Sequence, residues 1–207
     1  MLSSSKASMV KIRSKMKVLG ICGSPRKKGN SDLLLDRTLT GARASGADSE
    51  KIYLNEMLFR PCQEEEYYAV NSEGLSVVAD DMQKVYKQVH ECDVFILASP
   101  IFFGSLSAQT KAMIDRFQCV WVSRNLLHKQ IFTQKKAGAF ISVEASLRQD
   151  FFRNARSIVK NFFALINVRY SGELLCPGVE RRGDVRKIPG LMERAFELGR
   201  DLCSAGE

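Results

Sequence analysis

The chain has 207 residues, of which 45% are hydrophobic and 26% charged, the composition of one globular domain. It contains no apolar run long enough for a membrane-spanning helix, and too little Pro and Gly for a collagen-like or disordered chain. The net charge is +8; of 31 bases, eight precede the first acid, Asp32, and the rest match the 23 acids. We therefore expect residues 1–15 to be a disordered basic extension and residues 16–207 to form a single, nearly neutral domain.

The cysteines indicate the cellular location, and residues 1–15 bear on whether the chain binds nucleic acid. Six cysteines occur without a C-x-x-C pair, which excludes the common zinc and redox-dithiol motifs. No secreted disulfide framework is evident, so we expect a reducing, cytoplasmic location. The extension has no aromatic residue to stack on bases, so we expect no nucleic-acid partner. Salt-dependent binding that is lost on deleting residues 1–15 would support that alternative.

From Met16 onward, apolar runs and amphipathic segments alternate. In chain order we expect a strand at Val18–Cys22, a helix at Asn30–Ala44, a strand at Lys51–Leu54, a helix at Asp80–Val89, a strand at Val94–Ala98, a helix at Ser107–Gln118, a strand at Ala137–Val143, a helix at Gln149–Ile166, a strand at Val168–Leu175 and a helix at Pro189–Cys203. Asp80 and Gln83 approximate a capping box, and Pro189 suits the first helical position. Residues 59–79 do not fit the alternation, and we expect them to form a long surface loop.

Five strands alternating with helices predict an α/β fold with a doubly wound parallel sheet and three layers. The natural strand order is the flavodoxin-like 2-1-3-4-5. In that order strands one and three are neighbours, and their connections leave toward opposite faces of the sheet. The crevice at their carboxyl ends is where such sheets bind ligands.

The loop between the first strand and the first helix combines small, polar and basic residues. We expect its ligand-binding residues to be Ser24, Arg26, Gly29, Asn30 and Ser31. They lie where a helix N-terminus exposes free N–H groups, so they predict a site for a phosphate monoester. The spacing matches neither the Walker A motif nor G-x-G-x-x-G, which argues against ATP hydrolysis and a dinucleotide fingerprint. A polar turn without a ligand is the alternative.

The loop after the third strand is suited to a flat apolar ring. A proline fixes its backbone, a glycine permits close approach, and two phenylalanines can wall an aromatic group. We expect the ring to be bordered by Ser99, Pro100, Ile101, Phe102, Phe103 and Gly104. The alternative is that both phenylalanines are core or dimer-interface residues.

The segments CGSPRKKGNS, ADDMQKVY and CDVFILASPIFFGSLSAQTKAMIDRF, in this order, resemble the NADPH-dependent FMN reductase family, and within it the iron–sulfur flavoprotein branch. The resemblance covers about residues 16–203. It implies a flavodoxin-like fold, bound FMN, NAD(P)H as co-substrate, and a homodimer or homotetramer. It also implies that the first loop holds the phosphate and that residues 99–104 border the isoalloxazine.

The sequence departs from this branch at three places. After Pro61-Cys62 no cysteine occurs before Cys92, so the four ligands of a cluster are missing and we expect no iron–sulfur cluster and no metal site. Phe102 stands where the family commonly has Tyr, so a hydroxyl is lost. In the loop after the fourth strand, Glu144 either lies near the pyrimidine edge of the flavin or points to solvent.

The resemblance implies an oxidoreductase that passes a hydride from NAD(P)H through FMN to a small acceptor, which could be a quinone, a flavin, an azo or nitro compound, or a metal ion. Because the cofactor carries this chemistry, we expect no catalytic side chain, and expect His90 and His128 to be structural or solvated. Two alternatives remain: a flavodoxin-type one-electron carrier, which the neutral domain charge disfavours, and a non-enzymatic FMN-binding or interaction module.

The sequence also suggests contacts for several other charged residues. The candidates for contact with the 2′-phosphate of NADPH are Lys27, Lys28, Arg124 and Lys129, and the preference for NADH or NADPH is undecided. We expect Asp115 and Arg116 to form an ion pair at a helix end or interface, with Arg116 facing the flavin as the alternative. Lys111 is expected at the surface.

Overall fold

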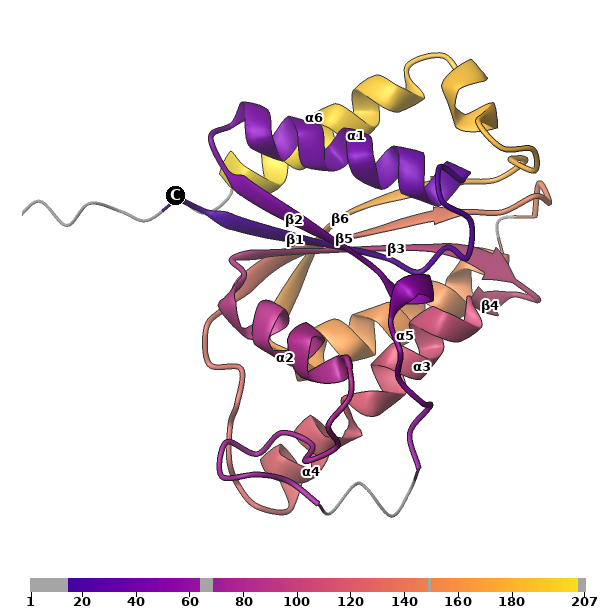
Figure 1. Ribbon diagram of the computed structural model, residues 1–207. Helices are drawn as coiled ribbons and strands as arrows, with labels where there is room; N and C mark the ends of the chain where they lie inside the picture. The colour runs from indigo at the N-terminus through magenta and orange to yellow at the C-terminus, as the bar shows by residue number, and fades with distance from the viewer. Residues whose placement is uncertain (1–14, 64–68, 149, 205–207) are drawn as a thin grey trace, which may run out of the picture.

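A parallel sheet runs through the middle of the molecule (Figure 1). The computed structural model describes residues 15–63, 69–148 and 150–204, and in these the parallel strands lie in the order β2-β1-β3-β5-β6. Their bounds are β1 Lys17–Cys22, β2 Asp48–Tyr53, β3 Val94–Phe102, β5 Lys136–Val143 and β6 Val168–Cys176. The short β4, Ser105–Leu106, pairs antiparallel with β3. The predicted fold and the predicted order of the five parallel strands are therefore confirmed.

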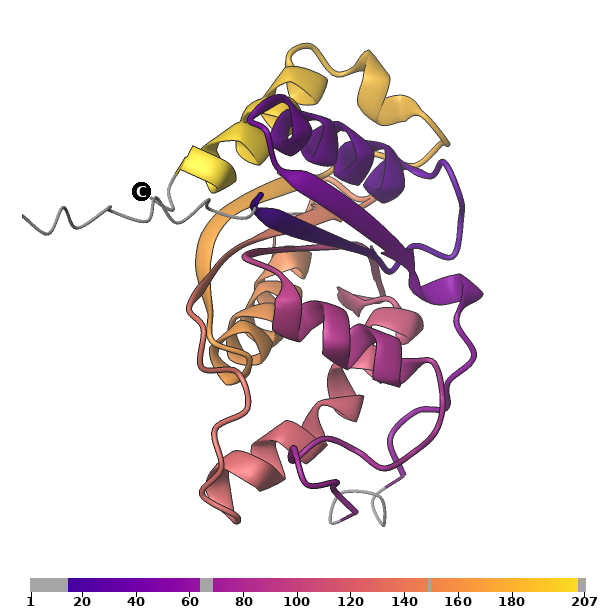
Figure 2. The same ribbon diagram turned by 60° about the vertical axis from the view of Figure 1, so that its left-hand side comes forward.

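Helices cover both faces of the sheet. α1 (Asn30–Ala44) and α6 (Leu191–Ser204) lie on one face, and α2 (Met82–Glu91), α3 (Ala108–Arg116), α4 (Gln118–Asn125) and α5 (Phe151–Leu165) lie on the other, as both views show (Figures 1 and 2). Short 3-10 turns are η1 (Leu54–Glu56) and η3 (Asp184–Lys187). None of the helices in the described part of the chain is long and apolar enough to cross a membrane.

Each face of the sheet has its own apolar core. Successive residues of β3 point to opposite faces, so Phe95 and Leu97 pack in the core under α2 and α5, whereas Ile96 and Ala98 pack in the core under α1 and α6. This double burial explains why the sequence of β3 is continuously apolar, as predicted for a strand covered on both sides.

Two of the predicted helices are corrected by the structure. The helix expected at Ser107–Gln118 is two helices, because the buried Phe117 leaves helical geometry and packs its ring against Tyr86 and Phe162, with ring centroids 5.0 Å away in each case. The last helix begins at Leu191 rather than Pro189, because Gly190 has φ of 71°.

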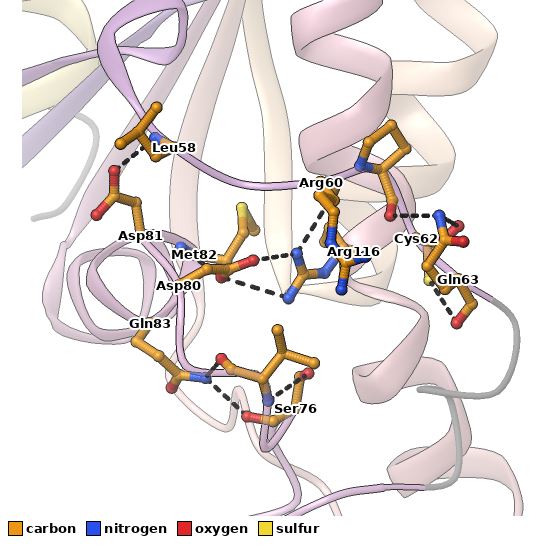
Figure 3. A network of polar contacts seen from close by, with 12 residues as sticks. Leu58, Arg60, Cys62, Gln63, Ser76, Asp80, Asp81, Met82, Gln83 and Arg116 are labelled. Atoms are coloured by element: carbon orange, nitrogen blue, oxygen red, sulfur yellow. Dashed lines mark hydrogen bonds and ion pairs between the residues drawn. The ribbon is translucent and has the colours of Figure 1, made fainter.

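Only half of the expected capping box forms at the start of α2. Asp80 accepts a hydrogen bond from the N–H of Met82 at 3.0 Å, but the amide of Gln83 donates to the carbonyls of Ser76 and Val78, both at 2.8 Å (Figure 3). Gln83 therefore fixes the preceding loop to the helix instead of closing a reciprocal cap.

The expected surface loop at residues 59–79 is only partly exposed. Residues 64–68 lie outside the described part of the chain, as do residues 1–14 of the expected extension. Val70 and Ser76 form an antiparallel bridge, and Leu75 and Ser76 are buried. The second half of this loop is thus anchored at Leu75 and Ser76, whereas residues such as Val77 stay exposed.

Candidate functional site

A cavity of about 220 Å³ opens at the carboxyl ends of β1 and β3. These strands are hydrogen-bonded neighbours, and the connections that follow them lead to α1 and α3 on opposite faces of the sheet (Figure 1). The cavity is lined by Ser24, Pro25, Arg26, Gly29, Asn30, Ser31, Pro100, Ile101, Phe102, Val143, Ala145, Val179, Glu180 and Arg182. The two loops selected from the sequence therefore line one site.

The first loop presents unsatisfied donors to this cavity. Ser31 is 1% exposed, and its Oγ has no hydrogen-bond partner among the described residues. The first hydrogen bond of α1 runs from the N–H of Leu33 to the carbonyl of Gly29 at 2.9 Å, so the N–H groups before Leu33 have no intrahelical partner. A buried free hydroxyl beside a helix N-terminus is the environment that an oxyanion stabilises.

The shape of the first loop is set by its own backbone and by Ser24. The N–H of Arg26 donates to Ser24 Oγ at 3.2 Å, and the N–H of Gly29 donates to the carbonyl of Arg26 at 3.0 Å. Lys28 takes up the left-handed conformation, with φ of 55°. The guanidinium of Arg26 is exposed at the cavity wall, where an anion can reach it.

Asp32 holds this loop from behind, a role that sequence analysis missed. Its fully buried carboxylate accepts hydrogen bonds from the N–H of Lys28 at 2.7 Å, from Lys51 Nζ at 2.8 Å and from the Tyr53 hydroxyl at 3.0 Å. Burial alone would lower the pKa of Lys51, but hydrogen bonds to Asp32 and Asp36 raise it above its usual range. Lys51 therefore stays charged and neutralises Asp32.

The second loop forms the apolar wall. Pro100, Ile101 and Phe102, the last residues of β3, line the cavity, and the chain then reverses through Phe103 and Gly104, whose φ angles are 51° and 72°. Both phenylalanines are exposed, so the alternative that they are core residues is wrong. Phe103 and Gly104 are not among the lining residues, and their contact with a ligand stays a prediction.

Ser99 lies beneath the second loop rather than in the cavity wall. It is fully buried; its Oγ donates to the carbonyl of Pro100 at 3.0 Å and accepts from the N–H of Ser107 at 3.1 Å. The structure thus assigns Ser99 the support of the loop, and direct contact with a ligand stays a prediction.

The remaining walls come from the loops after β5 and β6; sequence analysis considered only Glu144 in the first and did not select the second. Val143 and Ala145 follow β5, and Val179, Glu180 and Arg182 follow β6. The signal for them was their position at the same edge of the sheet as the two predicted loops. Glu144 neither lines the cavity nor points to solvent: it is buried, and its Oε1 accepts the N–H of Ser146 at 3.0 Å.

Arg116 lies elsewhere and corrects two expectations. Its guanidinium is 2% exposed, donates to Asp80 at 2.5 Å and also donates to the carbonyl of Arg60 at 3.1 Å (Figure 3). Asp115 instead pairs with Lys111 at 2.7 Å, so no Asp115–Arg116 pair forms. Arg116 is not among the cavity residues and ties residues 58–63 to α2 and α3. Lys111 is at the surface, as expected.

The other basic candidates and both histidines lie outside the cavity lining. Lys27 pairs with Glu56 beside the first loop, whereas Arg124 and Lys129 bond to main-chain carbonyls of Ala164 and Ser72. The residues that are simply exposed are Lys28, His90 and His128. The expectation that the histidines are structural or solvated fits these positions.

A larger hollow, about 420 Å³, lies at the opposite edge of the sheet, near the amino ends of β1 and β2. Exposed ionic side chains such as Lys17, Asp48, Glu50 and Glu91 form much of its wall. Open α/β sheets bind ligands at the carboxyl ends of their strands, so we assign the site to the smaller cavity.

Residues 16–168, about three quarters of the chain, match the family model for NADPH-dependent FMN reductase. The chain belongs to this family. It is 32% identical over 158 residues to an iron–sulfur flavoprotein of Methanocaldococcus jannaschii, covering 76% of this chain and 77% of the relative. It is 31% identical over 131 residues to an iron–sulfur flavoprotein of Methanosarcina thermophila, covering 63% of this chain and 64% of the relative.

Solved structures agree with this assignment at the level of the fold. An NAD(P)H:quinone oxidoreductase from Methanothermobacter marburgensis aligns with a TM-score of 0.65 at 17% identity, covering 91% of this chain and 98% of that one. An azoreductase from Bacillus anthracis aligns with a TM-score of 0.64 at 11% identity, covering 92% and 99%. Family membership makes the chain an NAD(P)H-dependent oxidoreductase of the FMN type.

The residues present fit FMN. The free Ser31 hydroxyl, the N-terminus of α1 and the Arg26 guanidinium suit a phosphate monoester, and the apolar wall at Ile101 and Phe102 suits a planar ring. The two halves of the cavity thus match the two chemically different ends of this cofactor.

An iron–sulfur cluster, which the names of the relatives include, does not fit this chain. All six cysteines lie in the described residues, but Cys92 and Cys119 belong to one core, Cys22, Cys176 and Cys203 belong to the core on the other face of the sheet, and Cys62 lies in a loop. No three His, Cys, Asp or Glu residues in the described part of the chain could hold a metal ion together. Burial also raises the pKa of Cys22 and Cys92 to about 12.

Proposed function

We propose that this chain binds FMN in the cavity and uses it to pass a hydride from NAD(P)H to a small acceptor. One observation carries the proposal: the cavity joins an unpartnered buried hydroxyl, Ser31, and a guanidinium, Arg26, to the apolar wall at Phe102. Family membership supports the general reaction, and the lining of the cavity supports FMN binding at this position.

At the polar end, the chain's own groups would bind and orient the phosphate. Ser31 Oγ and the first N–H groups of α1 donate hydrogen bonds, and Arg26 adds a charge-assisted contact. Asp32 keeps Lys28 in its left-handed conformation through the N–H contact at 2.7 Å, so these donors are arranged before a ligand arrives. The loop therefore spends little free energy on ordering when it binds an anion.

At the apolar end, the chain would position a ring and leave one face of it open. Pro100, Ile101 and Phe102 form a wall whose backbone is held from beneath by Ser99. Bound FMN supplies the hydride-accepting group, so no side-chain acid or base is required.

The electron acceptor is proposed to react directly at this cavity. Since no three His, Cys, Asp or Glu residues in the described ranges could hold a metal ion together, the two electrons would go to a diffusible acceptor such as a quinone, a free flavin, an azo or nitro compound, or a metal ion. The exposed Phe103, next to the cavity wall, favours a homodimer or homotetramer in which a second copy covers this edge.

Anaerobic mixing of the purified, FMN-loaded protein with NADPH and with NADH tests the proposal. We expect the 450 nm flavin band to bleach within seconds and to return when menadione is added. A protein that binds FMN but is not reduced by either nicotinamide would support the one-electron carrier instead. A protein that takes up no FMN would be a non-enzymatic module, and the proposal would fail.

A further inference from the structure

The loop between β6 and η3, residues 177–183, lines the cavity although it lies beyond the part of the chain that matches the family model, which ends at residue 168. Family membership therefore assigns no role to it. This loop contributes Val179, Glu180 and Arg182 to the cavity wall, together with residues of the first loop.

Asn30 fastens this loop to the first turn of α1. Its Nδ2 donates to the carbonyl of Arg181 at 2.9 Å, and its Oδ1 accepts the N–H of Gly183 at 2.9 Å. The two bonds bracket Arg182, so the backbone on both sides of this residue is fixed. Asn30 is 8% exposed, which shields both bonds from water. Its side chain therefore holds the loop, and its main-chain N–H at the start of α1 has no intrahelical partner.

The loop is anchored at its other end as well. The N–H of Val179 donates to the carbonyl of Glu144 at 2.9 Å, and the N–H of Gly178 donates to the carbonyl of Ser146 at 3.0 Å. With Asn30, these contacts tie residues 178–183 to two other walls of the cavity. Arg182 thus projects from a backbone that is positioned before any ligand binds.

The charges in this region point to an anion at Arg182. Lys187 pairs with Asp184 at 2.8 Å in the same segment, but the Arg182 guanidinium has no hydrogen bond or ion pair in the described part of the chain. The side chains that line the cavity carry two positive charges, Arg26 and Arg182, and one negative charge, Glu180. A phosphate monoester carries about −1.5 to −2 charges at pH 7 and can accept from two guanidinium forks.

We propose that Arg182 is a second guanidinium ligand for the phosphate of the flavin nucleotide, and that Asn30 is the positioning residue that holds it there. This inference rests on the proposed binding of FMN. Arg26 and Arg182 would approach the phosphate from two different loops, while Ser31 and the N-terminus of α1 contact it from a third side. The first loop alone would then be an incomplete phosphate site.

The test compares dissociation constants for FMN and for riboflavin, which lacks the phosphate, by quenching of flavin fluorescence. Arg182→Ala should weaken FMN binding on the order of ten- to hundredfold and leave riboflavin binding unchanged. Arg182→Lys, which keeps the charge but not the fork, should recover part of the loss. Arg186→Ala is the matched control, because Arg186 is an exposed arginine of the same segment that does not line the cavity.

A double-mutant cycle tests the role of Asn30. Asn30→Ala should weaken FMN binding in the natural chain but have little further effect in the Arg182→Ala background, because both changes remove the same contact. Fully additive losses would overturn the positioning role. Equal losses for FMN and riboflavin would show general damage to the loop and would overturn the proposal for Arg182.

The outcomes separate this inference from the proposed function. If the natural chain binds no FMN, the proposed function itself fails. If Arg26→Ala weakens FMN binding but Arg182→Ala does not, the site stands and the inference alone is wrong. If Arg182→Ala raises the KM for NADPH but leaves the FMN dissociation constant unchanged, Arg182 contacts a phosphate of NADPH instead. That result would also overturn the inference.

Discussion

The carboxylate of Asp32 accepts a hydrogen bond from the main-chain N–H of Lys28 at 2.7 Å, and Lys28 itself has a φ angle of 55°. The same carboxylate bonds to Lys51 and Tyr53 in β2. One buried acid thus connects the edge strand of the sheet to the loop that is expected to hold the phosphate. The geometry of the binding loop depends on a residue that would not touch the ligand.

Replacing Asp32 with Ala should weaken both the fold and the binding of FMN. The change leaves Lys51 and the Lys28 N–H without their buried acceptor, which we expect to lower the free energy of unfolding by about 2–3 kcal/mol. Urea denaturation measures this loss, and flavin titration measures the accompanying loss of affinity. Asp36→Ala is the control, since Asp36 also pairs with Lys51 but is exposed. Equal behaviour of the two variants would contradict the role given to Asp32.

Arg26→Ala should weaken FMN binding by about 1.5–3 kcal/mol, because a charge-assisted contact to the phosphate is lost. Riboflavin binding should not change. Lys27→Ala is a suitable control, since Lys27 is the next residue but pairs with Glu56 and does not line the cavity. An Arg26 variant that holds FMN as tightly as the natural chain would show that the phosphate lies elsewhere.

Gly29→Ala should also weaken binding, for a steric reason. The backbone at Gly29 has φ of −73°, which any residue can adopt, so a left-handed conformation is not the constraint. A Cβ there would lie 2.8 Å from the carbonyl oxygen of Arg26, which is the acceptor that closes the loop. We expect a loss of about 1–3 kcal/mol in FMN binding from this overpacking, measured by the same titration. An unchanged FMN affinity of Gly29→Ala would contradict this steric role of Gly29.

The loop after β1 and the apolar loop at the end of β3 were predictable because the features that identify them lie in short stretches of sequence. A buried strand that ends at small polar residues before a helix creates free N–H groups wherever it occurs, and Phe102 lies at the end of an apolar strand. Arg182 was not predictable, because its place in the cavity depends on pairing of β6 with β5 and on a bond between Asn30 and Gly183, which lie 153 residues apart. The Asp80–Arg116 pair likewise joins residues 36 apart.

Asp80→Ala should destabilise the fold without affecting the cavity. Arg116 is 2% exposed and keeps its contact with the Arg60 carbonyl, so removing the Asp80 carboxylate breaks a buried ion pair, a change that typically costs about 3–5 kcal/mol. Urea denaturation should show this loss, while the FMN dissociation constant of the folded variant should stay the same. A large change in FMN affinity would contradict the separation of Arg116 from the cavity, whose lining does not include it.

Lys136 should make stability increase toward alkaline pH. Burial at the start of β5 lowers its pKa, whereas nearby Cys92 and Asp93 oppose this to a lesser degree. In the window between the lowered folded pKa and the ordinary value of 10.5, the unfolded chain binds more protons, so stability rises with pH. Lys136→Met should be more stable at pH 7, with an advantage that shrinks through this window. Urea denaturation at several pH values measures this advantage. An advantage that stays constant up to pH 10.5 would contradict the lowered pKa of Lys136.

The most direct test of the whole account is a crystal structure of the protein grown or soaked with FMN. The account predicts density for the nucleotide in the cavity, with its phosphate in hydrogen-bonding distance of Ser31 Oγ and its ring against Ile101 and Phe102. An empty cavity at saturating FMN, or a phosphate bound away from the first turn of α1, would contradict it.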